Sequence, residues 1–593
     1  MRRIRRTADV MFGYGFRAAP AAMLTTLALG IVNGLSMGFF PFGFKIFTDA
    51  FVRRDSGGIV AGSIMAGGLI AVAWAAANLD ANVGFGLMDR VRLYISIRIA
   101  EFVNRVPGVE HFERPEYLRE LDLIEWNRGL LASGPRLSLD AMRMLLRGGA
   151  AAVLLGTVHP ILLVMPAFAA VPAFCDAWSV RIRQRCEERV DELRRLADQL
   201  FALAATAAPA KELRIFGLAG ELERRHATLA DEVRRETVRA AVVGAVLGAV
   251  GWIVFVAGFL GGIWLVLLQA LDGRATAGQV VMSVVVGQQV RLYLQQAAGT
   301  FGQLFTSART AQRILWLEDF AQAHGGRGSA DVPSRLERGI ALEHVTFRYP
   351  GTDADVLRDV NLSFPAGSIV AVVGENGAGK TTIMKLLARM YEPSSGSITV
   401  DGTDIGDFDL DAWRSSLSAA LQDFVQFELI ASETVGVGDL PRIDDADAID
   451  VAFDRAGAGD VIPTLDDGLS TQLGKSFVGG RDLSGGQWQK LALGRGMMRD
   501  RPLVLILDEP TASLDAETEH RLFERYAQAA RRARSETGAI TILVSHRFST
   551  VRAADLIVVV DEGRVVEAGS HADLMRNGAL YAELFTLQAK AYR

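Results

Sequence analysis

A glycine-rich run that ends in a lysine and a threonine offers the clearest chemistry in the sequence. Gly374-Glu-Asn-Gly-Ala-Gly-Lys-Thr381 fits the pattern G-x-x-x-x-G-K-[ST]. It follows the β-branched run 369–373 and precedes the helix-forming segment 382–388. Glycines let backbone N–H groups wrap phosphate oxygens, and the following helix adds its N-terminal dipole. The run therefore predicts a phosphate-binding loop between a strand and a helix.

Two side chains at the end of this loop have separate expected roles. Lys380 is expected to reach the β- and γ-phosphates of ATP, and the Thr381 hydroxyl is expected to ligate Mg²⁺. The residues expected to contact the nucleotide from this loop are Gly374, Glu375, Asn376, Gly377, Ala378, Gly379, Lys380, Thr381 and Thr382.

An apolar run that ends in two carboxylates predicts the second nucleotide element. Leu503-Val-Leu-Ile-Leu507 is followed directly by Asp508 and Glu509. Such a strand delivers Asp508 to the metal, usually through water, and places Glu509 to polarise an attacking water. A buried strand that merely ends in an acidic turn is the plain alternative, and the phosphate-binding loop earlier in the chain disfavours it.

Further motifs resemble, in type and order, the ATPase domain of ABC transporters. Leu483-Ser-Gly-Gly-Gln487 is similar to the signature of that family and precedes the acidic strand, as the family requires. The resemblance assigns Tyr349 to stacking on adenine and Gln422 to sensing Mg²⁺ and the γ-phosphate. It also assigns Ser513-Leu-Asp515 to the family's D-loop and His546 to contact with the γ-phosphate.

The resemblance also implies a partner chain. In this family two ATPase domains close head to tail, and the signature of one chain completes the nucleotide site of the other. Ser484, Gly485, Gly486 and Gln487 are then expected to serve the partner's nucleotide. The motifs are intact, so we expect a homodimer of half-transporters, with a heterodimer as the alternative. The expected catalytic residues are Glu509, His546 and Gln422, and the expected Mg²⁺ ligands are Thr381, Gln422 and Asp508.

The first half of the chain contains long apolar segments, which precede the predicted ATPase domain. Half of the 593 residues are hydrophobic. About 20 apolar residues cross a bilayer as a helix, and the predicted spans are 21–47, 58–79, 142–159, 160–180, 242–270 and 277–300. We therefore expect an all-α, six-helix transmembrane domain over 1–320, a linker over 321–338 and an α/β P-loop ABC ATPase domain over 339–593.

Basic residues predict the orientation in the membrane. They concentrate in the two long connections after the second and fourth spans, which places those connections and both termini in the cytoplasm. Charges at helical spacing predict that the membrane helices continue into these connections. Breaks near 113–122 and 209–222 resemble the coupling helices of exporters. The chain is thus expected in a bilayer, as a multi-pass protein of a bacterial cell membrane.

Polar residues in the sixth span bear on the cargo. Gln288, Gln289, Arg291, Gln295 and Gln296 predict a polar cavity, because polar groups within spans are costly and mark pathways. The alternative is that they lie near a span end, packed or solvated.

Departures from the family pattern favour one branch of it. Trp488 replaces the commoner basic residue, and Gly494 and Gly496 stand where alanines are usual. Together with Gly474-Lys-Ser-Phe-Val-Gly-Gly480, this signature region is similar to the branch of lantibiotic-type peptide exporters.

The expected function is ATP-driven export of a peptide or amphipathic natural product. A drug or lipid exporter is the near alternative, and an importer built on the exporter fold is a rarer one. The predicted spans disfavour a soluble ABC ATPase of DNA repair or translation, and a net charge of −5 argues against a nucleic-acid partner. Intact Lys380, Asp508, Glu509 and His546 argue against a catalytically dead sensor.

Overall fold

The computed structural model describes residues 2–206, 209–325, 328–509, 525, 528, 530–545 and 551–591. The chain forms two compact units. One unit comprises residues 1–101 and 121–318, and the other comprises 102–120 and 319–593. The short segment 102–120, which lies in sequence between two long helices, therefore belongs with the α/β part of the chain.

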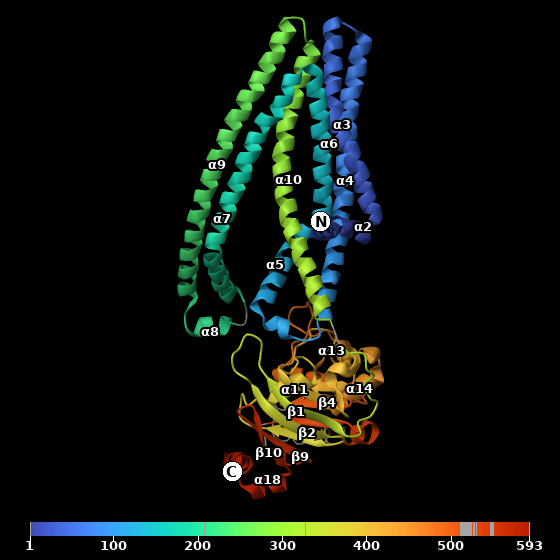
Figure 1. The fold of residues 1–593 in the computed structure, drawn as a ribbon, viewed down its shortest axis with the longest axis vertical. Coiled ribbons are helices and arrows are strands. Elements are labelled where there is room, and N and C mark those ends of the chain that lie inside the picture. The colour runs from blue at the N-terminus through green and yellow to red at the C-terminus, as the bar shows by residue number, and fades with distance from the viewer. Residues whose placement is uncertain are drawn as a thin grey trace. The chain divides into compact units, whose positions relative to one another are not determined.

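Long helices build the first unit (Figure 1). The long helices are α3 Pro20–Arg53, α4 Ser56–Arg105, α5 Pro115–Ala132, α6 Gly134–Val158, α7 Met165–Ala205, α9 Ala219–Leu271 and α10 Ala277–Ala323. The short elements are α1 Arg2–Ala8, the π-helix η1 Asp9–Gly13, α2 Tyr14–Ala18, the 3-10 helix η3 Pro160–Val164 and α8 Ala210–Ile215.

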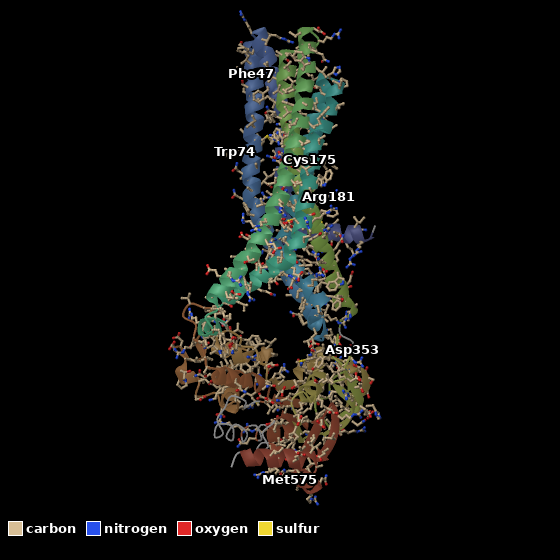
Figure 2. All side chains as sticks on the ribbon, turned by 90° about the vertical axis from the view of Figure 1, so that its left-hand side faces the viewer. Phe47, Trp74, Cys175, Arg181, Asp353 and Met575 are labelled. Carbon is tan, nitrogen blue, oxygen red and sulfur yellow. The ribbon has the colours of Figure 1, made fainter. Side chains whose placement is uncertain are left out.

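The helices continue well beyond their apolar parts, as the charge pattern predicts. With 41 residues, α7 is about 60 Å long, whereas a bilayer's hydrocarbon is about 30 Å thick. Figure 2 shows Cys175 and Arg181 on this one helix, and the sequence turns from apolar to charged at Arg181. The charged part of α7 therefore lies outside the apolar segment that suits a bilayer.

Five elements among the described residues are long and apolar enough to cross a membrane. They are Pro20–Arg53, Ser56–Arg105, Gly134–Val158, Pro160–Ala205 and Ala219–Leu271. The predicted sixth span, 277–300, lies in the 47-residue helix α10, which is not in this set. Glutamines and an arginine lower the hydropathy of α10, so six spans stay a prediction.

Small residues let the helices of the first unit approach closely. A Cβ added at Gly38 of α3 would lie 2.5 Å from the Cβ of Ala150 in α6. On α9, a Cβ at Gly251 would lie 2.9 Å from the Cα of Pro172 in α7, and α7 and α9 run side by side (Figure 1). These close approaches show that the face of α6 with Ala150 packs on α3, and that the face of α7 with Pro172 packs on α9.

Both predicted breaks exist, and one of them lies elsewhere than predicted. The first break runs from Val106 to Arg114, includes the 3-10 helix η2 Glu110–Glu113, and ends where Pro115 opens α5. The prediction of 113–122 was therefore wrong for most of its length, because proline suits the first position of a helix. The second break contains α8 and then Gly217, whose φ is +64°.

Two sheets form the scaffold of the second unit, within the described part of the chain. The four-stranded antiparallel sheet has the order β2-β1-β4-β5, and the six-stranded sheet has the order β10-β9-β3-β8-β7-β6. In the latter, β9, β3, β8, β7 and β6 are parallel and β10 is antiparallel. The strands are β1 Gly339–Phe347, β2 Leu357–Pro365, β3 Ile369–Val373, β4 Ser395–Val400, β5 Thr403–Asp404, β6 Leu417–Ala420, β7 Val504–Asp508, β8 Ile540–Val544, β9 Leu556–Asp561 and β10 Arg564–Gly569.

Helices cover these sheets in the same unit. They are α11 Lys380–Leu387, α12 Leu410–Ser415, α13 Ala431–Gly436, α14 Ala446–Arg455, α15 Gly485–Gly496, α18 His571–Asn577 and α19 Leu580–Ala591, with the 3-10 helices η4 Ile405–Asp407, η5 Leu440–Arg442, η6 Ile462–Thr464 and η7 Gly468–Ser470. The parallel strands are buried along their length because layers cover both faces of the sheet. The sequence predicts this α/β layering.

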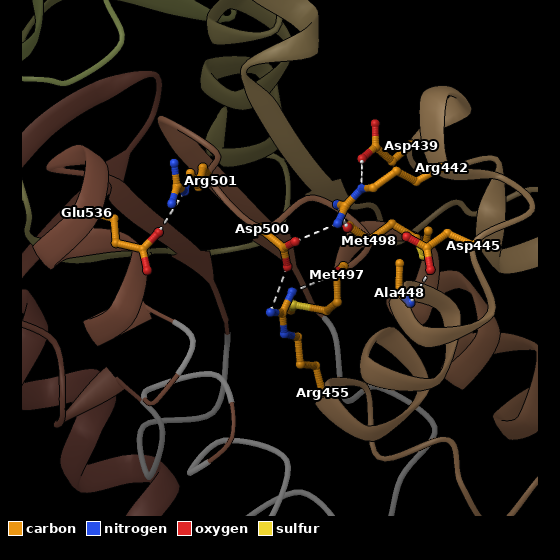
Figure 3. A network of polar contacts seen from close by, with 10 residues as sticks. All are labelled: Asp439, Arg442, Asp445, Ala448, Arg455, Met497, Met498, Asp500, Arg501 and Glu536. Atoms are coloured by element: carbon orange, nitrogen blue, oxygen red, sulfur yellow. Dashed lines mark hydrogen bonds and ion pairs between the residues drawn. The ribbon is translucent and has the colours of Figure 1, made fainter.

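A carboxylate ties the helical layer to the start of β7. Asp500 accepts from Arg442 at 2.5 Å and from Arg455 of α14 at 2.8 Å (Figure 3). Nearby, Arg501 pairs with Glu536 at 3.1 Å. Burial raises the pKa of Asp500, but the two arginines outweigh burial, so the pKa lies below its usual value.

Candidate functional site

The carboxyl ends of four parallel strands line one edge of the six-stranded sheet. β3, β8, β7 and β6 are neighbours in this order and run in parallel. Their carboxyl ends therefore lie along one edge, where ligands of open α/β sheets bind. The loop 374–379 leaves β3, Glu509 follows β7, and Gln422 follows β6. The sheet thus gathers segments that lie between 43 and 135 residues apart in the sequence.

The phosphate-binding loop has the backbone that its glycines permit. Gly374 has a φ of +150° and Gly379 a φ of +107°. A Cβ at Gly374 would lie 2.0 Å from the Val560 carbonyl oxygen, so only glycine fits there. The Lys380 ammonium donates to the carbonyls of Gly374 at 2.9 Å and Glu375 at 2.8 Å. Burial lowers the pKa of Lys380, and the two nearby carboxylates oppose that shift.

Thr381 and Asp508 form the centre of the candidate site. The Thr381 hydroxyl donates to Asp508 Oδ2 at 3.1 Å. Asp508 is 2% exposed, and its Oδ1 has no hydrogen-bond partner among the described residues. Burial raises the pKa of Asp508, and the Thr381 hydrogen bond lowers it in part. A hydroxyl beside a buried carboxylate with an unused oxygen fits the oxygen ligands that Mg²⁺ prefers.

Glu509 lies directly beyond the strand in an unusual backbone conformation. Its N–H donates to the Val544 carbonyl at 3.0 Å, which extends the pairing of β7 with β8. Its φ is +44°, a region that residues other than glycine seldom occupy. Backbone strain of this kind is common where a side chain is positioned for function. The chain therefore changes direction at Glu509, the residue that is expected to polarise water.

Tyr349 lies beside the phosphate-binding loop. It follows β1, and its hydroxyl lies 3.1 Å from the Thr382 hydroxyl. The Lys385 ammonium lies 5.3 Å from its ring centroid, and the Tyr391 ring lies 5.3 Å away, edge to face. The structure thus brings Tyr349 to the start of α11, and Thr381 of the same helix to Asp508, which is 127 residues further along the chain.

The signature residues begin helix α15. The Ser484 side chain accepts from the Gln487 N–H at 3.3 Å, and the Gln487 side chain accepts from the Ser484 N–H at 2.9 Å. This reciprocal capping box fixes the start of a 12-residue helix. Among the described residues, no hydrogen bond or ion pair joins 484–487 to the loop 374–382. Within one chain, the described residues therefore show no hydrogen bond or ion pair that holds the signature against the phosphate-binding loop.

Three further predicted parts of the site have different outcomes. Gln422 is exposed in the loop after β6. His546 and the segment 513–515 lie outside the described residues.

Sequence comparison decides the family. Residues 357–512 match the family model described as ABC transporter. The ATP-dependent lipid A-core flippase of Xylella fastidiosa is 33% identical over 439 residues, which are 72% of this chain and 69% of that protein. This chain belongs to the ABC transporter family. The family match implies that the second unit binds ATP.

Other relatives of this ABC transporter carry different names. The mitochondrial potassium channel ATP-binding subunit of Rattus norvegicus is 32% identical over 434 residues, 72% of this chain and 58% of that protein. The match thus spans less than two thirds of the length of that relative. A solved structure described as a bacterial Atm1-family ABC exporter with ATP bound has a TM-score of 0.76 at 23% identity, and covers 97% of this chain and 98% of that one. That similarity shows the exporter fold.

The glycines that depart from the family pattern have a packing reason in this ABC transporter. A Cβ at Gly496 would lie 2.8 Å from the Ala419 carbonyl oxygen of β6. A Cβ at Gly494 would lie 3.3 Å from both methyls of Val435. Trp488 is 3% exposed, so the position holds a core residue and not a surface charge. The signature helix therefore packs unusually close to the sheet.

Two residues near the site were missed from the sequence. Asp423 lies close enough to Asp508 to raise its pKa. Gln489 is buried and donates to the Glu509 carbonyl at 3.5 Å, which links the signature helix to the expected catalytic residue. The sequence offered a signal for each residue. Asp423 is an acidic residue next to Gln422, and Gln489 is a polar residue on the buried face of α15.

The first break contacts the ATPase core within the second unit. The Val109 N–H donates to the Met390 carbonyl at 3.0 Å. Arg414 of α12 donates to the Pro107 carbonyl at 2.5 Å, and the Tyr391 hydroxyl donates to the Glu113 carboxylate. A cavity of about 220 Å³ adjoins these contacts. The segment is therefore held by backbone and side chain to the loop after α11.

Proposed function

We propose that the chain is an ATP-hydrolysing exporter that moves an amphipathic molecule out of the cytoplasm. The observation that carries the proposal is the Thr381–Asp508 pair beside the phosphate-binding loop, in a chain that also has long apolar helices. The relatives named as a flippase and an exporter support the same activity. We further propose the cell membrane as its location, with both termini cytoplasmic.

Each residue of the site has a proposed task in hydrolysis. Lys380 leaves the carbonyls of its own loop and turns to the β- and γ-phosphates of ATP. Thr381 and Asp508 hold Mg²⁺, which would neutralise phosphate charge. Glu509 orients the attacking water, while Gln422 and His546 contact the γ-phosphate side. Tyr349 offers its ring to adenine.

We propose that two copies of the chain form the two nucleotide sites. The signature Ser484–Gln487 has no contact with its own loop among the described residues, which leaves its helix N-terminus free for a partner's phosphates. A complementation experiment tests the arrangement. Lys380→Ala and Ser484→Arg each disable both sites of a homodimer, but a mixed dimer keeps one complete site if sites form between chains.

The outcome of mixing is quantitative. In a 1:1 mixture half of the dimers are mixed, so about a quarter of the wild-type ATPase activity returns. No recovery in a mixture that contains mixed dimers would mean that each chain completes its own site. Native mass spectrometry of chains of two sizes establishes that mixed dimers are present.

Closure of the ATPase units is proposed to drive the membrane helices. ATP has greater affinity for the closed pair, and this difference in affinity supplies the driving force. The contacts of Pro107, Val109 and Glu113 with α12 and with the loop after α11 support a coupling role for the first break. The exposed side chains of Ile215 and Phe216 in the second break support a second docking point, on the partner chain.

Two cargo classes remain in the proposal. The signature region resembles that of peptide exporters, which favours a peptide. The relatives named as lipid A-core flippases favour a lipid. ATPase stimulation of the chain in lipid nanodiscs, by a cationic amphipathic peptide or by an anionic lipid, separates the two classes.

The experiment that tests the function compares wild type with Glu509→Gln in proteoliposomes. We expect the wild type to hydrolyse ATP and the variant to lose at least a hundredfold of that activity. The glutamine that replaces Glu509 is neutral and cannot polarise the attacking water. Thermal stability checks that the variant folds. Hydrolysis that survives in Glu509→Gln contradicts the assigned role, and a folded wild type without ATPase activity contradicts the self-sufficient exporter.

A further inference from the structure

A charged network lies among the helices of the first unit. Asp140, Arg143 and Arg147 follow each other on α6 at intervals of three and four residues, so they share one face. Arg143 pairs with Asp80 of α4 at 2.8 Å and with Asp140 at 3.2 Å. The side chains of Arg143 and Asp80 are 11% and 4% exposed. The charge of Arg143 is therefore neutralised inside the protein.

Arg147, one turn further along α6, has no such neutralisation. Its guanidinium donates to the side-chain carbonyl of Asn33 in α3 and lies 5.4 Å from the ring centroid of Tyr293 in α10. No ion pair among the described residues includes Arg147, and its Nε is buried without a hydrogen-bond partner there. Its hydrogen-bond and ring partners are thus neutral, and the carboxylate of Asp140 attracts it without forming an ion pair.

These partners are themselves held in place. The Asn33 amide donates to the Ala73 carbonyl of α4 at 2.7 Å. The Tyr293 hydroxyl donates to the Met37 carbonyl at 3.4 Å. Gln289, one turn before Tyr293, is 9% exposed, donates to the same carbonyl at 3.3 Å, and has an unpartnered buried Oε1 among the described residues. An amide with an unused acceptor oxygen therefore shares the Met37 carbonyl with the hydroxyl of Tyr293.

Placing a guanidinium without an ion-pair partner in an apolar helix bundle costs free energy. Arg147 lies near the middle of α6, one of the elements apolar enough to cross a membrane. Charged residues within membrane-spanning segments face the bundle interior, pair with one another or with backbone carbonyls, and mark the pathways of substrates. An anion would supply the charge that Arg147 lacks, and an Arg side chain binds phosphate or carboxylate through two parallel hydrogen bonds.

We propose that Arg147 binds the anionic group of an amphipathic molecule within the first unit, while the unused Oε1 of Gln289 accepts a hydrogen bond from a hydroxyl of the same molecule. The group is a phosphate or a carboxylate, and its apolar part contacts the apolar helices around it. This inference rests on the proposed export function and narrows its cargo to anionic amphiphiles. Arg143 is excluded from the role because Asp80 and Asp140 already occupy it.

The test uses the full chain in nanodiscs of zwitterionic lipid. The probes are lauroyl lysophosphatidic acid, lauroyl lysophosphatidylcholine with the same acyl chain, and inorganic phosphate. Binding is read without nucleotide, as the concentration of probe that half-saturates a thermal shift. Stimulation of ATP hydrolysis is read separately, so that loss of the anion site and loss of the exporter activity are distinguished.

The variants are Arg147→Gln, Arg147→Lys and Arg136→Gln. Arg136 is the matched control, because it also lies on α6 and stacks on a ring, Phe85, at 5.4 Å. It is 11 residues, or about 16 Å, from Arg147 along the helix. We expect the lysophosphatidic acid midpoint to rise about tenfold or more in Arg147→Gln, to recover in part in Arg147→Lys, and to hold in Arg136→Gln.

Several outcomes would overturn the proposal. Equal responses to lysophosphatidic acid and lysophosphatidylcholine would mean that the anionic group is not recognised. An unchanged midpoint in Arg147→Gln would move the site elsewhere. Arg147 would be only a structural crosslink if two results came together. Lysophosphatidic acid would not stabilise the wild type, and both Arg147→Gln and Arg147→Lys would lower the melting temperature. A response to inorganic phosphate equal to that of the lipid would make the site one for free phosphate, and would remove the amphiphile from the proposal.

Discussion

The N–H of Val109 donates to the carbonyl of Met390 at 3.0 Å, and this bond ties the break after α4 to the loop after the nucleotide-binding helix α11. Val109 lies in the segment 102–120, whose 19 residues pack with the ATPase unit, although most of α4 and of α5 belongs to the first unit. The end of α4 and the loop after α11 therefore belong to the same compact unit.

Gly108→Ala should weaken this docking. A Cβ at Gly108 would lie 2.9 Å from the Met390 carbonyl oxygen, so the segment must shift. We expect ATP hydrolysis to persist while transport per ATP falls severalfold. Gly129→Ala is the control, because a Cβ at Gly129 meets no atom within 4 Å. Transport and hydrolysis measured in the same proteoliposomes give the ratio, and an unchanged ratio in Gly108→Ala would count against coupling through this segment.

Acid should loosen the same segment through His111. His111 is 3% exposed, and neither ring nitrogen has a hydrogen-bond partner among the described residues. Burial lowers its pKa, and the charges of His324 and Arg114 lower it further. Its packing therefore contributes fully above the unfolded pKa of about 6.5. That contribution is lost as the pH falls from there to the lowered folded pKa.

Hydrogen exchange of the amides over 106–114 measures this effect. Between pH 7.5 and 5.5, protection corrected for intrinsic exchange should fall in wild type. In His111→Phe it should stay flat, because the aromatic packing against Phe112 and Tyr117 is kept and the titration is gone. A fall of equal size in both proteins would assign the pH effect to another group.

Asp508→Asn should abolish Mg²⁺-dependent hydrolysis with little effect on folding. The variant keeps an acceptor for the Thr381 hydroxyl but loses the charge that the metal needs. We expect ATPase activity to drop by about 100-fold or more. Asp500→Asn is the control carboxylate, since it pairs with Arg442 and Arg455 away from the site and costs at most about 1 kcal/mol of stability. Comparable activity losses in the two variants would contradict a metal role for Asp508.

Gly496→Ala should destabilise the protein, against ordinary helix propensity. Alanine favours a helix over glycine by about 1 kcal/mol. At Gly496 the added methyl meets the Ala419 carbonyl at 2.8 Å, and overpacking costs about 1–3 kcal/mol. At Gly494 the neighbours are the Val435 methyls at 3.3 Å, which can shift. Melting temperatures should fall in Gly496→Ala by more than in Gly494→Ala, and the reverse order would show that the close approach to β6 is not the constraint.

Motif spacing alone predicted the nucleotide site with its strand and helix context. The phosphate-binding loop, the Asp508 strand and the signature are local patterns, and each needs only a short segment and its neighbours to be recognised. The strands at 369–373, 504–508 and 540–544 follow from β-branched runs for the same reason. The charge pattern likewise predicted that helices such as α7 continue beyond their apolar parts.

Contacts between distant segments were decided only by the tertiary structure. Sequence spacing did not show that the first break ends at Pro115, that Gly496 packs on Ala419, or that Gln489 reaches Glu509. It also could not tell Arg143 from Arg147, two arginines one turn apart on α6. Asp80 lies 63 residues from Arg143, and only the packing of α4 on α6 brings its carboxylate to one guanidinium and leaves the other without one.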